Sequence, residues 1–463
     1  MAVQSGSLTS SPLTAPQARS LTQWLAYIEQ AHPAATAGIA MGLERVEAVR
    51  RAMNLHFDVP VFTVGGTNGK GSTCVFLEAM LRAAGYRTGL YTSPHLLRYN
   101  ERVRINGIDQ DDDALCQAFA AVEAGRLAAG NDGNAVTLTY FEYGTLAAAW
   151  LFVQAGVEAV ILEVGLGGRL DAVNVFDPDC AIVTSIGIDH VDYLGPTREH
   201  IGFEKAGIFR AGVPAVCGDS EPPARLLSQA ETVGAKLLQI GRDFGYQKQD
   251  RQWLFWDAHG RRGGLAHPAL RGTRQLVNAS VALAALGTLH DRLPVSMQAV
   301  REGLMHAELR GRFQVLPGRP VMVLDVAHNP HAAAVLEDNL SAMGFHPDSH
   351  AVVGMMQDKD MQGVFRALAK RFSAWHCASL PGPRGASAAQ LAAQLQPVLL
   401  ELRDQAIAGG DKSAVLPQVF CYDSPSAALH AAKERAGQDD RICIFGSFLT
   451  VADVLTSGEC AGG

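Results

Sequence analysis

The chain has 463 residues, of which 48% are hydrophobic and 18% charged, so it is long enough for two or three packed domains. A net charge of −7 argues against a general affinity for nucleic acid or for an anionic membrane, and any anionic ligand must be held by local donors. Eight cysteines without a C-x-x-C pair indicate free thiols in a reducing compartment, not a disulfide framework or a zinc site.

Residues 1–20 are rich in Ser, Thr and Pro and are predicted to be a disordered lead-in. They lack the basic start and the apolar centre of a signal peptide, and no apolar run in the sequence reaches the length of a membrane span. We therefore expect a cytoplasmic protein that binds neither membrane nor nucleic acid.

Short apolar runs rich in β-branched residues alternate with longer helical patterns between residues 61 and 187. Four of the runs are typical of buried parallel strands, and two patterns that end in glycine are typical of helices. The runs are Val61–Val64, Thr88–Ser93, Glu158–Gly165 and Cys180–Gly187, and the helical patterns are Ser72–Gly85 and Thr145–Gly156. The alternation predicts an α/β fold built on a doubly wound, mostly parallel sheet.

The alternation breaks at Arg251–Gly260, which is predicted to form a small β excursion, and resumes beyond residue 320. Four further apolar runs there predict a second, smaller α/β domain of Rossmann-like type. These runs are Val321–His328, His350–Met356, Ala374–Leu380 and Ile442–Phe448. The turn-rich segment Leu316–Pro320 precedes the first of them, so we expect one domain over residues 21–315 and the other over residues 316–463.

A glycine-rich loop follows the first predicted strand in the sequence VGGTNGKGST, Val64 to Thr73. The usual phosphate-loop pattern requires glycine at position 64 and a hydroxyl directly after Lys70, whereas this chain has Val64, Gly71 and a hydroxyl one residue late, at Ser72. The order of strand, loop and helix still suits phosphate, because backbone N–H groups converge on the ligand and Lys70 can bridge phosphates. The alternative is a glycine-rich helix entry that binds no ligand.

Two further stretches place polar side chains at the carboxyl ends of predicted strands, where open α/β sheets bind ligands. Glu163 ends one strand in VILEVGLGGRLDA, where its carboxylate is either a ligand for the Mg²⁺ of a nucleotide or an ordinary surface group. His190 follows another strand between two aspartates, so it is either a metal ligand or a satisfied structural histidine. Thr197 is predicted to cap a helix that carries Lys205.

Eight motifs follow one another along the chain: GGTNGKGST, YTSPHLLRYNERVRING, LTYFEYGT, EVGLGGRLDAVN, IGIDHVDYLG, EKAGIF, LRGRFQV and DVAHNPHAA. In kind and order they resemble those of the folylpolyglutamate synthases and dihydrofolate synthases, relatives of the Mur peptidoglycan ligases. The resemblance spans roughly Ala40 to Phe448. The late hydroxyl at Ser72 is itself the form of the phosphate loop in that family.

The resemblance implies a P-loop domain like the central domain of the Mur ligases, a C-terminal ligase domain, and an ATP-driven amide ligation. In that chemistry a substrate carboxylate attacks the γ-phosphate of ATP, and the amine of L-glutamate then opens the acyl phosphate. The implied partners are ATP, L-glutamate, dihydropteroate and reduced folates, with two Mg²⁺ ions. We expect a monomer that adds glutamate to both pterin substrates.

The resemblance also implies roles for single residues. Lys70, Glu163, His190 and Lys205 are implied to be catalytic, and Ser93, Glu163, His190 and Lys205 to bind metal. ATP contacts are implied for Thr67, Asn68, Gly69, Lys70, Gly71, Ser72, Asn278, Arg312, Asp325 and His328. An unmodified ammonium beside Mg²⁺ is unfavourable, so a plain Lys205 should point to Glu204 or to phosphate; the resemblance implies a carbamylated (N6-carboxylated) Lys205 instead.

Three segments are implied to form the dihydropteroate pocket: Ile39, Ala40, Met41 and Gly42; Thr139, Tyr140, Phe141 and Glu142; and Leu170, Asp171 and Ala172. These segments could serve folate alone, which would make the chain a monofunctional folylpolyglutamate synthase. A Mur-type amino-acid ligase would lack the pterin-side motifs, and a P-loop switch or transport ATPase would carry its hydroxyl directly after Lys70. A non-catalytic nucleotide-binding module would not need Glu163, His190 and Lys205 together.

Overall fold

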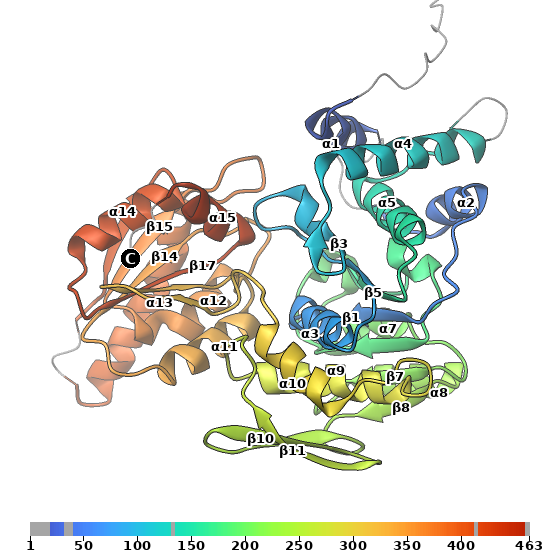
Figure 1. Cartoon of the computed structure of the whole chain (residues 1–463). Helices are drawn as coiled ribbons and strands as arrows, with labels where there is room; N and C mark the ends of the chain where they lie inside the picture. Colours follow the sequence, from blue (N-terminus) through green and yellow to red (C-terminus); the bar gives the residue numbers. More distant parts are fainter. Residues whose placement is uncertain (1–18, 32–39, 131–134, 412–414, 459–463) are drawn as a thin grey trace, which may run out of the picture.

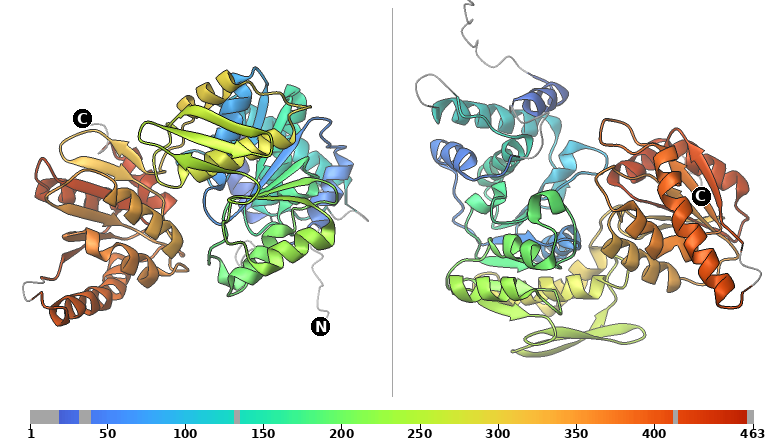
Figure 2. Two further views of the ribbon diagram at one scale, coloured as in Figure 1. Left: turned by 90° about the horizontal axis from the view of Figure 1, so that it is seen from below. Right: turned by 180° about the vertical axis from the view of Figure 1, so that it is seen from behind.

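The computed structural model describes residues 19–31, 40–130, 135–411 and 415–458, which form three sheets surrounded by helices (Figure 1). Most of the predicted lead-in, residues 1–18, lies outside the described residues. An 8-stranded sheet and a 6-stranded sheet each form the centre of one domain, and a 3-stranded sheet is appended to the first. The two domains lie side by side in all the views of Figures 1 and 2.

The first sheet has the order β4-β3-β2-β5-β1-β6-β7-β8. Its strands are β1 (Val61–Gly65), β2 (Thr88–Tyr91), β3 (Val103–Ile105), β4 (Ile108–Asp109), β5 (Ala159–Glu163), β6 (Cys180–Val183), β7 (Pro214–Cys217) and β8 (Lys236–Gln239). All neighbours pair in parallel except β2 with β3 and β3 with β4. Every residue of β1 and β5 is buried, because helices cover both faces of the sheet.

Two hydrophobic cores form on the two faces of this sheet. Helices on one face are α1 (Leu21–Gln30), α2 (Glu44–Ala52), α4 (Asp112–Ala128), α5 (Tyr140–Ala155), α7 (Arg198–Ala206) and α8 (Ala224–Val233), and those on the other are α3 (Lys70–Ala83), α9 (Gln275–Thr288) and α10 (Met297–His306). Short turns of helix lie in the loops: η2 (Tyr99–Arg102), η3 (Ala172–Val175) and α6 (Val191–Leu194). The sheet is therefore doubly wound.

The second domain has the strand order β12-β13-β17-β14-β15-β16. Its strands are β12 (Gln314–Leu316), β13 (Val321–Leu324), β14 (Ser349–Val353), β15 (Ala374–Ala378), β16 (Gln418–Tyr422) and β17 (Arg441–Phe445). Its helices are α11 (Pro330–Ser341), α12 (Met361–Leu368), η4 (Ala369–Arg371), α13 (Ala388–Ala408), α14 (Pro425–Arg435) and α15 (Phe448–Thr456). Apolar clusters lie on both faces of this sheet as well.

The predicted fold class, a doubly wound and mostly parallel sheet followed by a smaller α/β domain, is confirmed. The β excursion is also present: β10 (Gln252–Asp257) pairs with β9 (Gly245–Lys248) and β11 (Gly260–Ala266), and this small sheet projects beside α9 and α10 (Figure 1). Trp253 and Phe255 are fully buried in it. Because β12 pairs with β13, the Leu316–Pro320 turn lies inside the second sheet, and the chain passes between the domains over residues 307–313.

Some predicted strands are too long at their carboxyl ends. The structure ends β5 at Glu163 and β13 at Leu324, where the predicted runs continue to Gly165 and His328. The residues beyond each strand form loops at the sheet edge.

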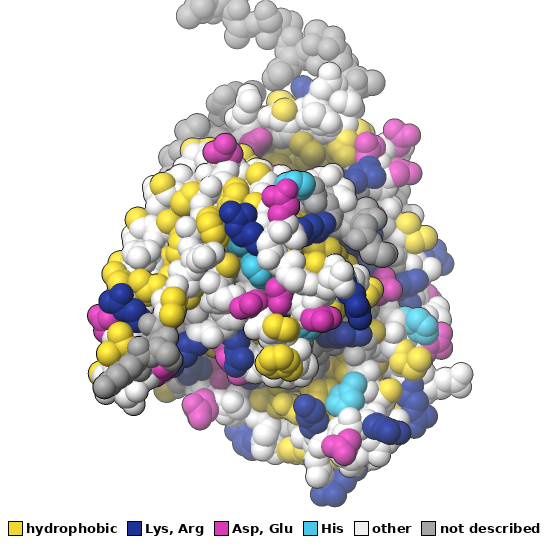
Figure 3. All heavy atoms as spheres, turned by 90° about the vertical axis from the view of Figure 1, so that its left-hand side faces the viewer, with side chains coloured by type: hydrophobic (Ala, Val, Ile, Leu, Met, Phe, Trp, Pro, Cys, Tyr) yellow, Lys and Arg dark blue, Asp and Glu magenta, His cyan; other side chains and the backbone are white. Residues whose placement is uncertain are grey.

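On the face shown in Figure 3 acidic and basic side chains are interspersed. None of the described helices combines the length and the apolarity needed to cross a membrane.

Candidate active site

A cleft between the two domains brings together all the residues predicted to bind ATP or metal. It is lined by the loop after β1, by Ser93, Glu163, His190 and Lys205 at the carboxyl edge of the first sheet, by Asn278 of α9, and by Arg312, Asp325 and His328 of the second domain. The carboxyl ends of parallel strands meet at one edge, so residues far apart in sequence share the cleft. Thr197 caps α7 as predicted: its Oγ1 accepts a hydrogen bond from the N–H of His200, and this helix carries Lys205.

The phosphate loop is tied to the loop after β6. Thr67 N donates to Ser185 O (2.8 Å), and Asn68 N donates to Ser185 Oγ (3.1 Å). Lys70 Nζ donates to the carbonyl oxygens of Gly66 (3.1 Å) and Thr67 (3.3 Å) and so lies over the loop. The N–H groups of the first turn of α3 have no partner within the helix and are available to an anion. Residues Lys70 to Ser72 therefore offer more free donors than Thr67 and Asn68 do.

The glycines at positions 66 and 69 have no room for a side chain. Both have left-handed backbone, with φ of +143° and +89°. A Cβ on Gly66 would lie 2.0 Å from Thr184 Oγ1, and one on Gly69 would lie 2.5 Å from Asn278 Oδ1. The loop is thus packed closely on β6 and α9, which leaves its opposite side to the cleft.

Glu163 is 5% exposed at the end of β5, and its Oε2 accepts a hydrogen bond from Ser93 N (3.0 Å). A Cβ on Gly71 would lie 3.8 Å from Glu163 Oε1, so the carboxylate lies beside the start of α3. Burial raises its pKa, and Lys70 opposes this only in part. Among the described residues no Lys, Arg or His forms a salt bridge with Glu163, so a bound cation would stabilise its charged form.

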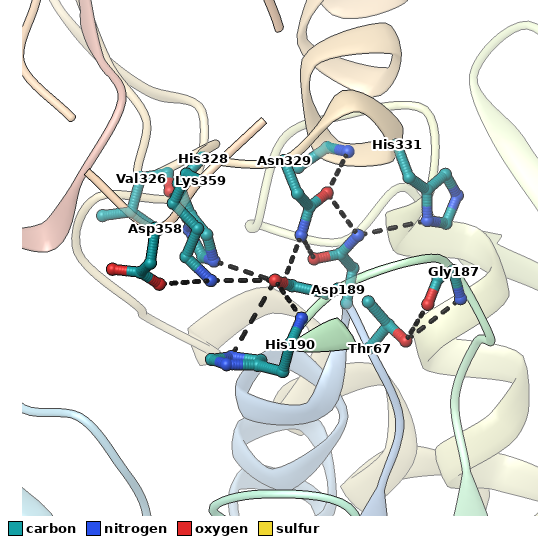
Figure 4. A network of polar contacts seen from close by, with 12 residues as sticks. Thr67, Gly187, Asp189, His190, Val326, His328, Asn329, His331, Asp358 and Lys359 are labelled. Carbon is teal, nitrogen blue, oxygen red and sulfur yellow. Dashed lines mark hydrogen bonds and ion pairs between the residues drawn. The ribbon is translucent and has the colours of Figure 1, made fainter. Parts of the chain in front are cut away.

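His190 has left-handed backbone (φ +51°) at the start of α6. Burial lowers the pKa of its imidazole to about 4 against the attraction of Asp189, so the ring is neutral at physiological pH, as a metal ligand must be. Asp189 is held by Lys359 Nζ at 2.8 Å and by Asn329 Nδ2 at 2.9 Å (Figure 4). Burial alone would raise the pKa of Asp189, but His328, His190 and Lys359 hold it well below its usual range.

Lys205 lines the cleft and is 3% exposed. Burial, strengthened by the positive charge of Lys70, lowers the pKa of its amine to about 7. The neighbouring Glu204 pairs with Arg169 instead (2.9 Å), so the structure does not contain the Lys205–Glu204 ion pair expected for a plain lysine. A buried amine that is largely neutral at physiological pH is a reactive group.

The second domain contributes a cation and a carboxylate. Asp325 follows β13, and its oxygens accept hydrogen bonds from Phe313 N (2.8 Å) and Ala327 N (2.7 Å). The guanidinium carbon of Arg312 lies 4.8 Å from the ring centre of Phe448. His328 Nδ1 lies 2.8 Å from Val326 O, which directs its Nε2 towards Asp189 (3.7 Å).

Asn278 is fixed on α9 by Gln275 Oε1, which accepts from its Nδ2 (3.0 Å). Gln275 Nε2 in turn donates to Ser72 Oγ (3.4 Å). These contacts orient both the late hydroxyl and the asparagine against the phosphate loop.

Three of the four predicted metal ligands have the chemistry to bind a hard divalent cation. Glu163 supplies a buried carboxylate without a cationic partner among the described residues, Ser93 a hydroxyl, and His190 a neutral imidazole. In the described ranges no group of three or more His, Cys, Asp or Glu is close enough to hold a metal by itself. A metal held here would therefore need further ligands besides these three side chains.

Two of the predicted pterin-pocket segments turn out to be joined to each other. Thr139 and Glu142 form the capping box of α5, and Glu142 is 3% exposed. Arg45 pairs with Glu142 (2.9 Å) and also donates to Ala40 O (3.2 Å). The capping-box spacing was visible in the sequence as T-x-x-E, whereas the Arg45 contact was not. Ile39 lies outside the described residues.

The segments predicted to form the pterin pocket border the cleft through two glycines that line it. A Cβ on Gly165 would lie 2.7 Å from Phe141 Cζ, and one on Gly167 would lie 3.8 Å from Met41 Cε. Asp171 is 4% exposed and accepts from Leu166 N (2.8 Å) and Val173 N (3.1 Å), which stabilises this loop. Gly42 and Leu170 are half-buried, Ala172 is buried, and the Tyr140 ring packs at 5.8 Å from that of Tyr99.

Comparison with known proteins shows first to which broad class of proteins this chain belongs. The Mur ligase middle domain matches residues 64–286, and the glutamate ligase domain of the Mur ligases matches residues 311–448. These two matches span both domains and the cleft between them.

Relatives over nearly the whole length define the family within that class. The dihydrofolate synthase/folylpolyglutamate synthase of Escherichia coli K12 is 45% identical over 442 residues, which cover 95% of this chain and 96% of the relative. The structure of E. coli FolC in complex with DHPP and ADP matches with a TM-score of 0.86 and 44% identity, over 96% of this chain and 99% of that one. A bifunctional folylpolyglutamate synthase/dihydrofolate synthase with Mn, AMPPNP and L-glutamate bound has a TM-score of 0.83 at 43% identity, over 96% and 100%. The chain belongs to the dihydrofolate synthase/folylpolyglutamate synthase family.

Proposed function

We propose that this chain is an ATP-dependent ligase that joins L-glutamate to dihydropteroate, giving dihydrofolate, and to reduced folates, giving folylpolyglutamates. The observation that carries the proposal is the meeting of Lys70, Glu163, His190 and Lys205 at one sheet edge, opposite Arg312 and Asp325 of the second domain. Family membership supports the same activity.

In the proposed reaction the chain's own groups position and neutralise charge. The first turn of α3 and Lys70 hold the phosphates of ATP, and Arg312 approaches them from the second domain. The carboxylate of dihydropteroate or folate attacks the γ-phosphate, and ADP leaves. The α-amine of glutamate then attacks the acyl carbon, loses a proton and displaces phosphate.

Magnesium, when bound, would neutralise the phosphate charge of the nucleotide. Ser93, Glu163 and His190 are the proposed protein ligands, and two ions are proposed because the cleft serves both the nucleotide and the acyl phosphate. Asn278, Asp325 and His328 are proposed to contact the nucleotide, and residues 40–42, 139–142 and 170–172 to form the dihydropteroate pocket.

We further propose that Lys205 is carbamylated. Its burial and its lowered pKa, about 7, support this, because only the neutral amine reacts with CO₂. The Nζ lone pair of the neutral amine bonds to the carbon of CO₂, one proton leaves, and the product is an anion with two oxygens. Such oxygens are ligands that Mg²⁺ prefers, and they would complete the set begun by Glu163.

The experiment that tests the function is an ADP-release assay with product mass analysis. The purified protein receives ATP, Mg²⁺ and L-glutamate with either dihydropteroate or tetrahydrofolate. We expect ADP release only when a pterin carboxylate and glutamate are both present. If ADP is released with tetrahydrofolate but not with dihydropteroate, the chain is a monofunctional folylpolyglutamate synthase. If neither pterin substrate leads to ADP release, the assignment is wrong.

Lys70→Ala is expected to lower turnover by about 10²-fold or more while leaving the fold intact, because the lysine contributes charge and not packing. Lys236→Ala is the matched control, since Lys236 is exposed on β8 of the same domain. Near-normal ligation by Lys70→Ala would refute the role of the loop.

A further inference from the structure

A set of amide and carboxylate contacts joins the phosphate loop to the second domain, and none of the roles proposed above accounts for it (Figure 4). Asn329, which is 2% exposed, lies at its centre. Its Nδ2 donates to Asp189 Oδ2 (2.9 Å) and to Asn68 Oδ1 (3.3 Å). Asn68 Nδ2 donates back to Asn329 Oδ1 (3.3 Å), so the two amides are paired across the domain interface.

Asn329 also has a local structural task, but that task uses only one end of its side chain. It is the N-cap of α11, and its Oδ1 accepts a hydrogen bond from Ala332 N (2.8 Å). Serine or aspartate caps a helix as well as asparagine does. Aspartate, however, lacks a donor, and the serine hydroxyl cannot reach as far. The contacts of Nδ2 are therefore what distinguishes asparagine at this position.

Both receiving groups are fixed on the first domain. The backbone of Asn68 is held by three hydrogen bonds: its N–H donates to Ser185 Oγ, and its carbonyl oxygen accepts from Thr184 Oγ1 (2.7 Å) and Ser185 Oγ (2.9 Å). Asp189 takes a second donor from the other domain, Lys359 Nζ at 2.8 Å. The side chains of Asp189 and Lys359 are 11% and 9% exposed, so this ion pair is shielded from water.

We propose that Asn329 is a positioning residue that fixes the second domain against the phosphate loop, through Asn68 and Asp189, in the arrangement that brings Arg312 and Asp325 to the nucleotide. Only the expected effect of Asn329 on catalysis rests on the proposed function. Asn329 itself is not assigned to substrate or nucleotide. Loss of its Nδ2 contacts should weaken productive ATP binding without unfolding α11.

The test uses Asn329→Ser in the full-length chain, because serine keeps the helix cap and removes all three hydrogen bonds of this side chain across the interface. The matched control is Ser387→Asn, the reverse exchange at the N-cap of α13. We expect Asn329→Ser to lower kcat/KM for ATP by about tenfold and to raise the dissociation constant of ADP–Mg²⁺. Thermal stability should stay close to that of the native chain, and Ser387→Asn should change none of these quantities.

Two further measurements separate positioning from a merely structural role. In a double-mutant cycle, Asn68→Ala with Asn329→Ser should lose less than the sum of the two single losses, because both substitutions remove the same paired amides and only the Asp189 contact is lost in addition. Small-angle X-ray scattering with ADP–Mg²⁺ should give a larger radius of gyration for Asn329→Ser than for the native chain. Additive losses in the cycle, or native values of ADP affinity and radius of gyration, would overturn the proposal. Nucleotide affinity and scattering need no ligation, so they remain informative even if the native chain fails to join glutamate to a pterin.

Discussion

Lys205 has unusual surroundings for a lysine, because it is almost fully buried and lies near the positive charge of Lys70. Its pKa of about 7 lies below that of a free lysine, so protonation is favoured in the unfolded chain and opposed in the folded one. This single group therefore makes the fold less stable below pH 7, and the penalty fades as the pH rises from 7 towards the unfolded value. The fraction of neutral amine, which carbamylation requires, likewise rises with pH.

At the residue scale we therefore predict a dependence on both CO₂ and pH. With a pKa of about 7, roughly one-tenth of the amine is neutral at pH 6 and roughly nine-tenths at pH 8. Enzyme depleted of CO₂ should lose activity and recover it on addition of bicarbonate more fully at pH 8 than at pH 6. With ¹³C-bicarbonate, NMR should show a carbamate carbon in the native chain and none in Lys205→Ala.

Lys205→Ala should be inactive at every bicarbonate concentration, and acetate should restore part of its activity by supplying carboxylate oxygens. A native enzyme that keeps full activity without CO₂, with no carbamate signal, would show that the unmodified amine is the working form.

At the element scale, the phosphate loop and α3 carry glycines with similar backbone but different surroundings. Gly69 (φ +89°) precedes α3, and its Cβ would strike Asn278, whereas Gly85 (φ +93°) follows α3 and has nothing within 4 Å. Alanine at either position costs about 1 kcal/mol of stability through the left-handed backbone. Only Gly69→Ala also displaces the loop.

We predict that Gly69→Ala lowers the affinity for ADP more than tenfold and that Gly85→Ala leaves it unchanged, measured by calorimetric titration. Both variants should still fold, with Gly69→Ala melting at the lower temperature because its Cβ would meet Asn278. Equal nucleotide affinities would mean that the close packing of the loop on Asn278 has no part in binding.

The elements were predictable where local pattern decides them. The apolar runs predicted β1, β5, β6 and β13, and the carboxyl-edge rule predicted that Glu163 and His190 share one edge. The ends of strands were less predictable, because apolar residues such as Val164, whose N–H still donates to Val64 O (2.9 Å), continue past the last residue of β5. The capping box of Thr139 and Glu142 could also have been found, since its spacing is a local signal.

At the scale of the whole molecule, the packing of the two domains decides which side chains meet. Asn329 and Lys359 reach Asp189 only after both sheets have formed and docked. No periodicity or spacing in the sequence encodes such contacts. The resemblance implied that Arg312 and Asp325 contact ATP, but it gave no sign of the paired amides that join the two domains. The sequence likewise gave no signal for the partly buried Arg45–Glu142 ion pair.

In the proposed function the cleft activates a pterin carboxylate as an acyl phosphate and passes it to glutamate. The most direct measurement uses dihydropteroate with ¹⁸O in its carboxylate, together with ATP, Mg²⁺ and L-glutamate, and follows the label by mass spectrometry. We predict that each ligation transfers one ¹⁸O atom to the released inorganic phosphate and leaves the other in the new amide. Phosphate without label, in a reaction that still consumes ATP, would contradict the acyl-phosphate route and the ligase assignment that rests on it.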